Sequence, residues 1–270
     1  MIFDGKAFAG QIEATLRLRL RSGVRVPKIV SVLVGDDSAS ELYTKLKKQA
    51  AERVGIEFEV VEIESGFSIQ DLGSRIEQIG EREDVTGIMV QLPIPGLQGQ
   101  ALKDILSAIP IEKDVDGLRW EESKIVPATV RAVLAILENI AQNQKFEIRN
   151  SKIVVLGSRG AVGRPLVQSL KSRGLEVGEI EWDTKNPAVL TKEAEVVISC
   201  VGKAGLVTGD MVKEGVIAID VGMSSAGGKV VGDMTQEVYQ KASVAVPVPG
   251  GVGPVTISSL MANVVKIYGK

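Results

Sequence analysis

The sequence contains no histidine, few aromatic residues and a single cysteine. Its 270 residues include His 0, aromatic residues at 4% and one Cys, Cys200. Without histidine the chain cannot build a Ser-His-Asp triad, a Cys-His dyad or an HExxH zinc site. One cysteine excludes an intramolecular disulfide and a cysteine-rich metal site, and we expect no bound metal. Acid–base chemistry near neutral pH is therefore left to Lys, Tyr, Asp or Glu.

The sequence also lacks a strong net charge and long apolar runs. Lys and Arg total 32 and Asp and Glu total 34, a net charge of -2, which argues against a nucleic-acid partner. The apolar runs are well short of the ~18 residues of a membrane span, and the N-terminus turns polar at Asp4. The sequence therefore predicts a cytoplasmic protein with no signal peptide and no membrane segment.

Short β-branched runs alternate with helical patterns along the chain. Such near-continuous apolar runs are typical of parallel strands that are buried on both faces. Strands are predicted over 29–35, 86–93, 153–157, 194–202 and 216–222. Helices are predicted over 40–54 (with Ser40 as N-cap and Gly55 as the stop), 69–83, 129–143 and 255–268. The alternation predicts an α/β fold, and we place a domain boundary in the helix after Pro127.

A glycine-rich turn follows the predicted strand 153–157. It spans Gly157, Ser158, Arg159, Gly163, Arg164 and Pro165, with a helical pattern after it. Glycines at this place let the backbone approach a pyrophosphate, and the acidic residues Glu179, Glu181 and Asp183 suit a ribose hydroxyl. The spacing GxxGxxG is not the dinucleotide fingerprint GxGxxG, so a tight structural turn is the alternative.

Tyr43 and Lys47 lie four residues apart, on one face of the predicted helix 40–54. A partly desolvated lysine has a lowered pKa and can act as a base, so Lys47 is the substitute for the missing histidine. Lys45 and Lys48 flank Lys47, and the alternative is a solvated basic face.

Three further segments carry candidate residues. Gln91 ends a predicted strand, where α/β sheets place ligand contacts, and Asp116 lies in a turn that ends in glycine. The run 247–256, PVPGGVGPVT, alternates rigid and permissive residues, which indicates a shaped loop close to a ligand. Gly232, Asp233 and Met234 form a turn that could face the same cleft. The alternative for each segment is a structural turn or cap.

Taken in order, these segments resemble the bifunctional methylenetetrahydrofolate dehydrogenase/cyclohydrolase family over nearly the whole chain. The matching motifs are VGDDSAS through Tyr43 and Lys47 (34–47), VQLPIP (90–95), KDVDG (113–117), VGRP (162–165) and PVPGGVGPVT (247–256). The resemblance implies a folate domain over 1–126, with 255–270 packing back on it. It also implies a linking helix over 127–145, a Rossmann-type NAD(P)-binding domain over 146–254, and a cleft between the two domains.

The resemblance implies oxidation of 5,10-methylenetetrahydrofolate to the methenyl form with NADP, followed by hydrolysis to 10-formyltetrahydrofolate. It makes Lys47 the central catalytic residue, with Tyr43 orienting the folate, Gln91 setting the protonation state of Lys47, Asp116 holding the pterin and Ser40 supporting Lys47. Pro249, Gly250 and Gly251 would also contact the substrate. The cofactor residues would be Gly157, Ser158, Arg159, Gly163, Arg164, Pro165, Glu181, Val201 and Gly202. The resemblance also suggests a homodimer.

One departure from the family bears on the cofactor. The family stretch His-Ser-x-Thr, whose serine helps to hold the 2′-phosphate of NADP, reads EWDT at 181–184. Glu181 and Asp183 would repel a phosphate and suit a hydroxyl, although Arg159 could still bind the phosphate. NAD is therefore the alternative cofactor. The alternative function is a cyclohydrolase or folate-binding protein with reduced or NAD-dependent dehydrogenase activity, and a purely structural α/β subunit is a third hypothesis.

Overall fold

The computed structural model describes residues 1–20, 25–64, 66–144 and 146–269. It divides into two compact units. The first unit consists of Gly10–Ala128 and Ile257–Lys270, and the second unit consists of Met1–Ala9 and Thr129–Thr256. The predicted domain bounds 1–126, 127–145 and 146–254 stay a prediction, and residue 145 of the predicted linking helix lies outside the described residues.

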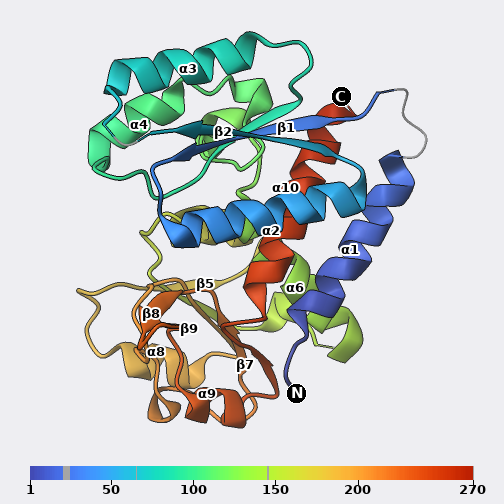
Figure 1. The fold of residues 1–270 in the computed structure, drawn as a ribbon. Helices are drawn as coiled ribbons and strands as arrows, with labels where there is room; N and C mark the ends of the chain where they lie inside the picture. Colours follow the sequence, from blue (N-terminus) through green and yellow to red (C-terminus); the bar gives the residue numbers. More distant parts are fainter. Residues whose placement is uncertain (21–24, 65, 145, 270) are drawn as a thin grey trace. The chain divides into compact units, whose positions relative to one another are not determined.

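A three-stranded parallel sheet forms the centre of the first unit, with strand order β2-β1-β3 (Figure 1). The strands are β1 (Lys28–Val34), β2 (Glu57–Ile63) and β3 (Gly87–Val90). The helices of this unit are α2 (Ser38–Val54), α3 (Ile69–Glu81), α4 (Gly99–Ser107), α5 (Trp120–Ser123) and most of α1 (Gly5–Leu20) and α10 (Val252–Tyr268). A 3₁₀ turn covers Ile111–Lys113.

Successive residues of β1 and β3 point to opposite faces of this sheet, as strand geometry requires. Val30 and Val32 are buried in one cluster with side chains of α3 and α4. Ile29 and Met89 are buried in a second cluster with side chains of α1, α2 and α10. The sheet is therefore covered on both faces, which explains why its central strand is an almost unbroken apolar run.

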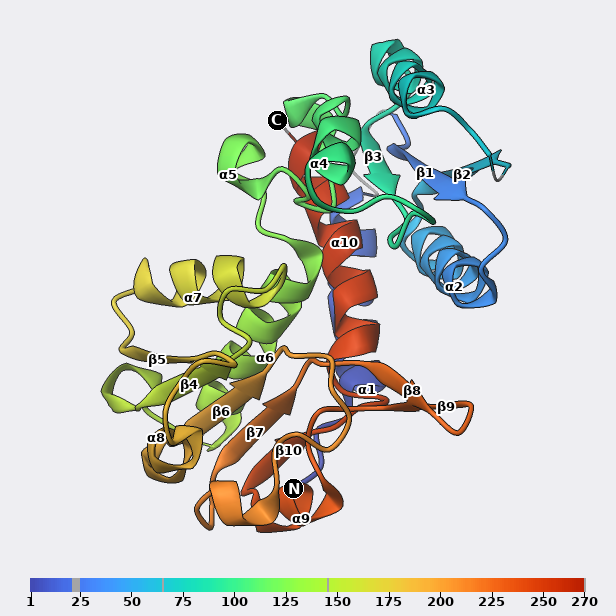
Figure 2. The ribbon, with the colours of Figure 1, turned by 90° about the vertical axis from the view of Figure 1, so that its left-hand side faces the viewer.

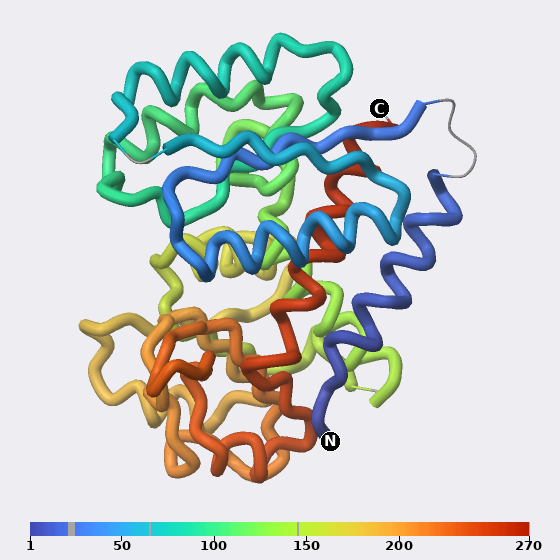
Figure 3. Tube along the Cα trace, in the orientation of Figure 1, coloured from blue at the N-terminus to red at the C-terminus, as the bar shows by residue number. Residues whose placement is uncertain are grey.

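Helix α10 completes the core of the first unit. Its Met261 is buried in one cluster with Leu16 of α1, and Figure 3 shows the two helices passing close to each other. The buried Asn263 side chain donates hydrogen bonds to the carbonyl oxygens of Val115 (2.9 Å) and Val126 (3.0 Å). The prediction that the C-terminal helix returns to the first domain is thereby confirmed.

A five-stranded parallel sheet forms the centre of the second unit, in the order β10-β7-β6-β4-β5. Figure 2 shows α6 and α7 on one side of this sheet and α8 and α9 on the other. The strands are β4 (Ile153–Leu156), β5 (Val177–Ile180), β6 (Val196–Ser199), β7 (Ile217–Asp220) and β10 (Val244–Val246). The helices are α6 (Ala128–Gln144), α7 (Gly163–Lys171), α8 (Pro187–Glu193) and α9 (Gln236–Lys241). Because the strand order reverses between β4 and β6, a ligand site is expected at the carboxyl ends of these two strands.

Smaller elements complete the second unit. A hairpin joins β8 (Ser224–Ala226) to β9 (Lys229–Val231), and 3₁₀ turns cover Ile148–Asn150 and Gly209–Met211. The N-terminal segment extends the sheet beside β10, because the Phe3 amide donates to the Ala245 carbonyl at 2.8 Å.

The structure confirms all five predicted strands and corrects two details of the predicted helices. Asp37, not Ser40, is the N-cap of α2: its carboxylate accepts a hydrogen bond from the Ser40 amide, and the helix begins at Ser38. Gly55 ends α2 with φ +92°, as predicted. Helix α10 begins at Val252 instead of Val255, because a proline fits the first turn of a helix, where no intrahelical donor is needed. In the described part of the chain, no helix combines the length and apolarity needed to cross a membrane.

Candidate active site

The first unit brings Lys47 and Gln91 together. Gln91 directly follows β3 and shares the sheet face of Met89, which packs against α2, the helix that carries Lys47. The Lys47 ammonium donates a 2.9 Å hydrogen bond to Oε1 of Gln91. Nε2 of Gln91 donates to the Leu92 carbonyl at 2.9 Å, which orients the amide so that its oxygen faces the lysine. The position of Gln91 at a strand end was therefore informative.

The surroundings of Lys47 favour its neutral form. Burial lowers the pKa of Lys47 below the ordinary lysine value, and the negative charge of Asp116 opposes this shift to a smaller extent. Gln91, its hydrogen-bond partner, is a neutral amide that does not compensate a full positive charge. Lys45 and Lys48 are exposed, whereas Lys47 is half-buried. The alternative of a uniformly solvated basic face therefore does not describe Lys47.

Two other candidate residues lie on the same helix. Tyr43 is half-buried, and its burial raises the pKa of the phenol, so Tyr43 stays neutral. Ser40 is buried in the first turn and hydrogen-bonds to Asp37 through both its amide and its side chain, which lowers the pKa of the Asp37 carboxyl. The structure thus gives Ser40 a role at the start of the helix, where it anchors the N-cap.

The two acids of the KDVDG motif differ in their surroundings. Asp114 is fully buried, and its carboxylate accepts hydrogen bonds from the amides of Leu118 (3.0 Å) and Arg119 (2.9 Å). Burial raises the pKa of Asp114, and these hydrogen bonds oppose the shift. Asp116 is only partly buried, and its charge acts on Lys47. Asp114 therefore holds the turn, while Asp116 remains the acid that can reach a ligand.

The glycine-rich turn in the second unit leads from β4 into α7. Gly157 has φ +75°, and a Cβ at this position would lie 2.9 Å from the carbonyl oxygen of Cys200. A Cβ at Gly163, in the first turn of α7, would lie 2.0 Å from the Gly157 carbonyl oxygen. Both positions therefore require glycine for the close approach of loop and helix, which leaves a helix N-terminus at the carboxyl end of β4. The candidates Arg164 and Pro165 follow in this helix, with Arg164 exposed and Pro165 buried.

An acidic side chain lies over the glycine-rich turn. Glu181 directly follows β5, and its Oε1 accepts hydrogen bonds from the Ser158 hydroxyl (3.1 Å) and the Arg159 amide. The Arg159 guanidinium forms an ion pair with Asp183 at 3.1 Å. Glu181, Ser158 and Arg159 are thus brought together at the neighbouring carboxyl ends of β4 and β5, as the sequence suggested.

The candidates Val201 and Gly202 lie in the loop after β6. Asp233, which the sequence placed in the turn 232–234, holds this loop. The fully buried Asp233 accepts hydrogen bonds from the amides of Val201 (2.8 Å), Gly202 (3.2 Å) and Lys203 (2.7 Å) and from the Ser199 hydroxyl (2.6 Å). Its carboxylate needs these donors to compensate its burial. The neighbours of Asp233 in the turn, Gly232 and Met234, line one pocket together with Val248 of the run 247–256, as expected of a turn that faces the same cleft as that loop.

Asp220, at the end of β7, was missed from the sequence. It is fully buried and accepts hydrogen bonds from the amides of Asp233 (3.0 Å) and Met234 (2.9 Å) and from the Tyr239 hydroxyl (2.7 Å). Burial raises the pKa of Asp220 to about 6 despite these bonds. The signal was a carboxylate that ends an otherwise apolar strand, Val216 to Asp220.

The loop that contains Pro249, Gly250 and Gly251 lies in the second unit, between β10 and α10. The Gly251 amide donates to the Pro247 carbonyl (2.9 Å), and the Gly5 amide donates to the Gly250 carbonyl (3.1 Å). A Cβ at Gly251 would lie 2.5 Å from the Pro247 carbonyl oxygen. Pro249 and Gly250 are exposed. The loop is therefore fixed by its own backbone, and its tip is open to a ligand.

Taken by class, the second unit is a nucleotide-binding α/β domain. It has a parallel sheet with a switch point, a glycine-rich turn there and an acid after the next strand. Two family models match the chain: "Tetrahydrofolate dehydrogenase/cyclohydrolase, catalytic domain" over residues 3–116, and "Tetrahydrofolate dehydrogenase/cyclohydrolase, NAD(P)-binding domain" over residues 127–270.

The chain belongs to the bifunctional tetrahydrofolate dehydrogenase/cyclohydrolase family, which confirms the resemblance found in its motifs. It is 38% identical to "Bifunctional protein FolD 2" of Lactobacillus johnsonii, over 100% of this chain and 98% of that protein. It is 37% identical to "Bifunctional protein FolD" of Exiguobacterium sp., over 100% of this chain and 99% of that protein. The predicted class of enzyme, an oxidoreductase and hydrolase of one-carbon folate metabolism, is confirmed by this membership.

Solved structures agree in fold over the whole chain. The bifunctional FolD enzyme of Campylobacter jejuni superposes with a TM-score of 0.90 at 34% identity, covering 100% of this chain and 98% of that chain. The Trypanosoma brucei enzyme, solved in complex with NADP cofactor and inhibitor, gives a TM-score of 0.87 at 31% identity, covering 100% and 97%. The predicted α/β fold with a catalytic domain and an NAD(P)-binding domain is confirmed.

Proposed function

We propose that this chain oxidises 5,10-methylenetetrahydrofolate to the methenyl form and hydrolyses that product to 10-formyltetrahydrofolate. The observation that carries the proposal is the hydrogen bond of 2.9 Å between the half-buried Lys47 and the neutral side chain of Gln91. It places an amine with a lowered pKa in a chain that has no histidine. Such an amine has the acid–base capacity that hydrolysis requires.

The hydrolysis needs neither a metal nor a covalent nucleophile, because the methenyl carbon is already electrophilic. Water adds to this carbon and forms a C–O bond, and the neutral amine of Lys47 takes one proton from the water. The Lys47 ammonium then gives this proton to N5 as the bond from the carbon to N5 breaks, which restores the neutral amine and leaves the formyl group on N10. The second water proton is released to solvent, so atoms and charge balance.

The other candidates in the first unit have positioning roles. Gln91 accepts a hydrogen bond from Lys47 and, because it is uncharged, compensates the ammonium less than a carboxylate would. Asp116 holds the pterin through its carboxylate, and Tyr43 orients the folate. Ser40 supports Lys47 indirectly, because its bonds to Asp37 fix the first turn of the helix that carries the lysine. In the second unit, Pro249, Gly250 and Gly251 contact the substrate.

The second unit holds the dinucleotide. The close backbone approach at Gly157 and Gly163 fits a pyrophosphate beside α7, and Arg164 and Pro165 continue that helix. Ser158, Arg159 and Glu181 take the ribose end, while Val201 and Gly202 present the loop after β6. When bound, the nicotinamide ring accepts the hydride from the methylene carbon of the folate.

The residues at the ribose end of the cofactor site bear on the choice between NADP and NAD. NADP is the cofactor that the family resemblance implies, and the geometry around Glu181 favours NAD as an accepted alternative. The Glu181 carboxylate lies over the glycine-rich turn, and Asp183 occupies the Arg159 guanidinium that a 2′-phosphate would need. A phosphate here would meet two carboxylates, which disfavours it electrostatically.

Steady-state kinetics with both cofactors tests this choice. We expect kcat/KM for NADP to exceed that for NAD by less than about a hundredfold, which corresponds to roughly 2.7 kcal/mol. Glu181→Gln removes the charge at constant shape and should lower KM for NADP more than KM for NAD. A wild-type preference for NADP above a hundredfold would contradict the proposal.

Spectroscopic assays of the two reactions separate the proposed function from its alternatives. Methylene oxidation with each cofactor and methenyl hydrolysis without cofactor are followed on the same protein. If both activities are observed, the proposal is supported. If only hydrolysis is observed, the protein is a cyclohydrolase whose redox step has been lost. If neither is observed, it is a binding or structural protein.

Three further expectations belong to this proposal. The chain forms a homodimer, which light scattering measures directly. It is located in the cytoplasm, which cell fractionation tests. Residues 1–126, with 255–270, form the folate domain, and residues 146–254 form the cofactor domain, joined by the helix over 127–145. Limited proteolysis should cut between these parts and leave their interiors intact.

A further inference from the structure

An exposed tryptophan, Trp182, lies beside the proposed cofactor residues and has no role in the proposed reaction or in cofactor binding as described for those residues. The side chain of Trp182 is 90% exposed, the highest value among the exposed large apolar side chains of the described residues; the next is Leu18 at 64%. Tryptophan carries a large apolar surface that is normally covered in part. A side chain this open, next to a ligand site, indicates that a ligand covers it.

The turn that carries Trp182 is rigid. The Thr184 amide donates to the Glu181 carbonyl at 3.0 Å, and the Glu181 amide donates to the Thr184 hydroxyl at 2.8 Å. Trp182 and Asp183 are therefore the two central residues of a hydrogen-bonded turn directly after β5. The backbone is closed on both sides of Trp182, so the indole is presented by a fixed support.

Both neighbours of Trp182 face the glycine-rich turn. Glu181 accepts hydrogen bonds from Ser158 and Arg159, and Asp183 is paired with the Arg159 guanidinium. An acid after the second strand of a dinucleotide-binding unit accepts a hydrogen bond from the ribose of the adenosine half. Because adenine is joined to the carbon next to the one that carries the 2′-hydroxyl, the base lies within reach of the residue beside that acid.

We propose that Trp182 stacks on the adenine ring of the bound dinucleotide and forms the adenine subsite of this enzyme. This inference rests on the proposed function, because it takes the glycine-rich turn to hold NAD or NADP. Stacking of a base on an aromatic side chain needs no matching donors, so a single exposed indole on a rigid turn is sufficient. The contact acts on cofactor affinity and leaves the chemistry at Lys47 unchanged.

Tryptophan fluorescence tests the stacking directly, because the chain has only Trp120 and Trp182. In a Trp120→Phe variant, Trp182 is the single reporter. We expect NAD and AMP to quench this fluorescence with saturation, and nicotinamide mononucleotide, which lacks adenine, to leave it unchanged. The matched control is Trp182→Phe, in which Trp120 alone reports and AMP has no effect.

Kinetics supply the second measurement. Trp182→Ala should raise KM for NAD about tenfold at unchanged kcat, a loss of about 1.4 kcal/mol. Trp182→Phe should stay within about threefold of the wild type, because it keeps an aromatic face. Hydrolysis of methenyltetrahydrofolate, which needs no cofactor, should be equal in all three proteins, and this equality excludes misfolding as the cause.

Two results would overturn the adenine subsite: AMP leaves Trp182 fluorescence unchanged, or Trp182→Ala has the wild-type KM. A fluorescence that changes with protein concentration in the absence of nucleotide would also overturn it, because Trp182 would then be covered by a second copy. Failure of the proposed function gives a different pattern, since the wild-type protein would then oxidise no methylenetetrahydrofolate whether or not AMP quenches Trp182.

Discussion

Two lysines at opposite ends of the sheet in the first unit show how surroundings decide what a side chain does. Lys28 begins β1, and its ammonium lies 2.8 Å from Asp84 and 3.5 Å from Glu57. Lys47 lies on α2, which follows the carboxyl end of β1, and its partner is the uncharged Gln91. The pKa of Lys28 is raised by its carboxylate partners, whereas burial lowers the pKa of Lys47.

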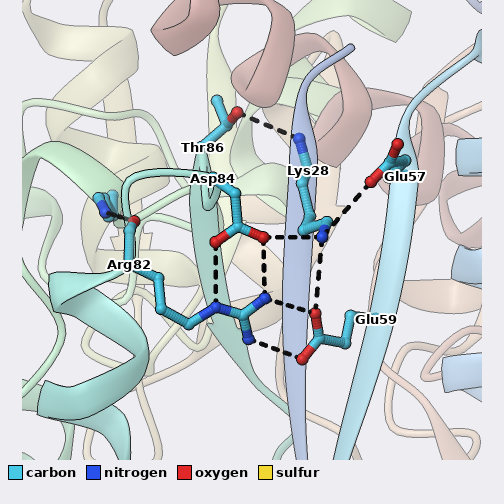
Figure 4. A network of polar contacts seen from close by, with 7 residues as sticks. Lys28, Glu57, Glu59, Arg82, Asp84 and Thr86 are labelled. Atoms are coloured by element: carbon cyan, nitrogen blue, oxygen red, sulfur yellow. Dashed lines mark hydrogen bonds and ion pairs between the residues drawn. The ribbon is translucent and has the colours of Figure 1, made fainter.

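The amino end of the sheet is built from ion pairs. Figure 4 shows the Arg82 guanidinium between the carboxylates of Glu59 and Asp84, with Lys28 joined to the same two acids. The network links β1, β2 and the segment before β3. Its charges are compensated and partly exposed to solvent, so the network contributes modestly to stability. The uncompensated lysine lies toward the other end, where α/β sheets bind ligands.

Removing the amine of Lys47 should have the largest effect. Lys47→Met keeps an unbranched stem that ends where the lysine has Cε and deletes the proton acceptor, so methenyl hydrolysis should fall by about 10²–10⁴-fold. The rate of loss of methenyltetrahydrofolate absorbance measures it. Lys28→Met is the matched control at the other end of the sheet and should hydrolyse at the wild-type rate. Equal rates for Lys47→Met and wild type would remove Lys47 from the mechanism.

Changing the partner of Lys47 should move the pH dependence. Gln91→Glu makes the surroundings of Lys47 resemble those of Lys28, so the lysine pKa rises. The acid limb of the hydrolysis pH profile should then move to higher pH. At a fixed pH below this limb, the rate should fall about tenfold for each pH unit that the limb moves. Gln91→Met, which removes the acceptor without adding charge, should move the same limb downward. Two profiles that move together would show that Gln91 does not set the protonation of Lys47.

The two lysines should also have opposite effects on stability. Lys47→Met removes a poorly compensated charge and should raise the free energy of unfolding at pH 7 by up to about 1 kcal/mol. Lys28→Met breaks favourable pairs and should lower it. Denaturant midpoints of both variants measure the signs. In the wild type, the Lys47 contribution makes stability rise with pH between its lowered pKa and the ordinary lysine pKa, while the Lys28 contribution is lost only as pH rises through its raised pKa.

The smallest expected effect belongs to the ion-pair network. Arg82→Met should lower the free energy of unfolding by about 0.2–1 kcal/mol, an effect that added salt reduces, and it should leave both activities unchanged. The pKa of Glu59 is lowered by Arg82, so its contribution is present above the ordinary carboxyl range and is lost as pH falls through the lowered pKa. Unfolding curves at several pH and salt values check this. A salt-independent loss would mean that Arg82 acts through packing of its side chain.

The sequence predicts five of the strands and the candidate lysine, because these follow local rules. An apolar run such as 153–156 predicts a buried strand wherever it packs. Strand β2 was not among the predicted strands, because three acidic residues interrupt EFEVVEI and it lacks the near-continuous apolar run on which the strand predictions rest. The four-residue spacing of Tyr43 and Lys47 was visible, whereas the hydrogen bond from Lys47 to Gln91 joins residues that only the folded sheet brings together.

The buried acids of the second unit show the limit of local reasoning. Asp233 lies in a glycine-containing turn that was expected to face a cleft, yet its own carboxylate is fully buried against the amides of Val201 and Lys203. Asp220 ends an apolar strand and binds the Tyr239 hydroxyl, nineteen positions further along the chain. Such polar contacts depend on which loops meet after folding, and a single sequence does not state this.

The place of helix α10 in the first unit has a consequence for synthesis on the ribosome. Met261 is buried in the same cluster as Leu16 and Ile29, and the Asn263 side chain binds the Val115 and Val126 carbonyls. These late residues reach the ribosome exit only after the whole stretch Thr129–Thr256 has been made. The first unit to be translated is therefore the last to close its core, and until then the apolar side chains that α10 covers stay exposed.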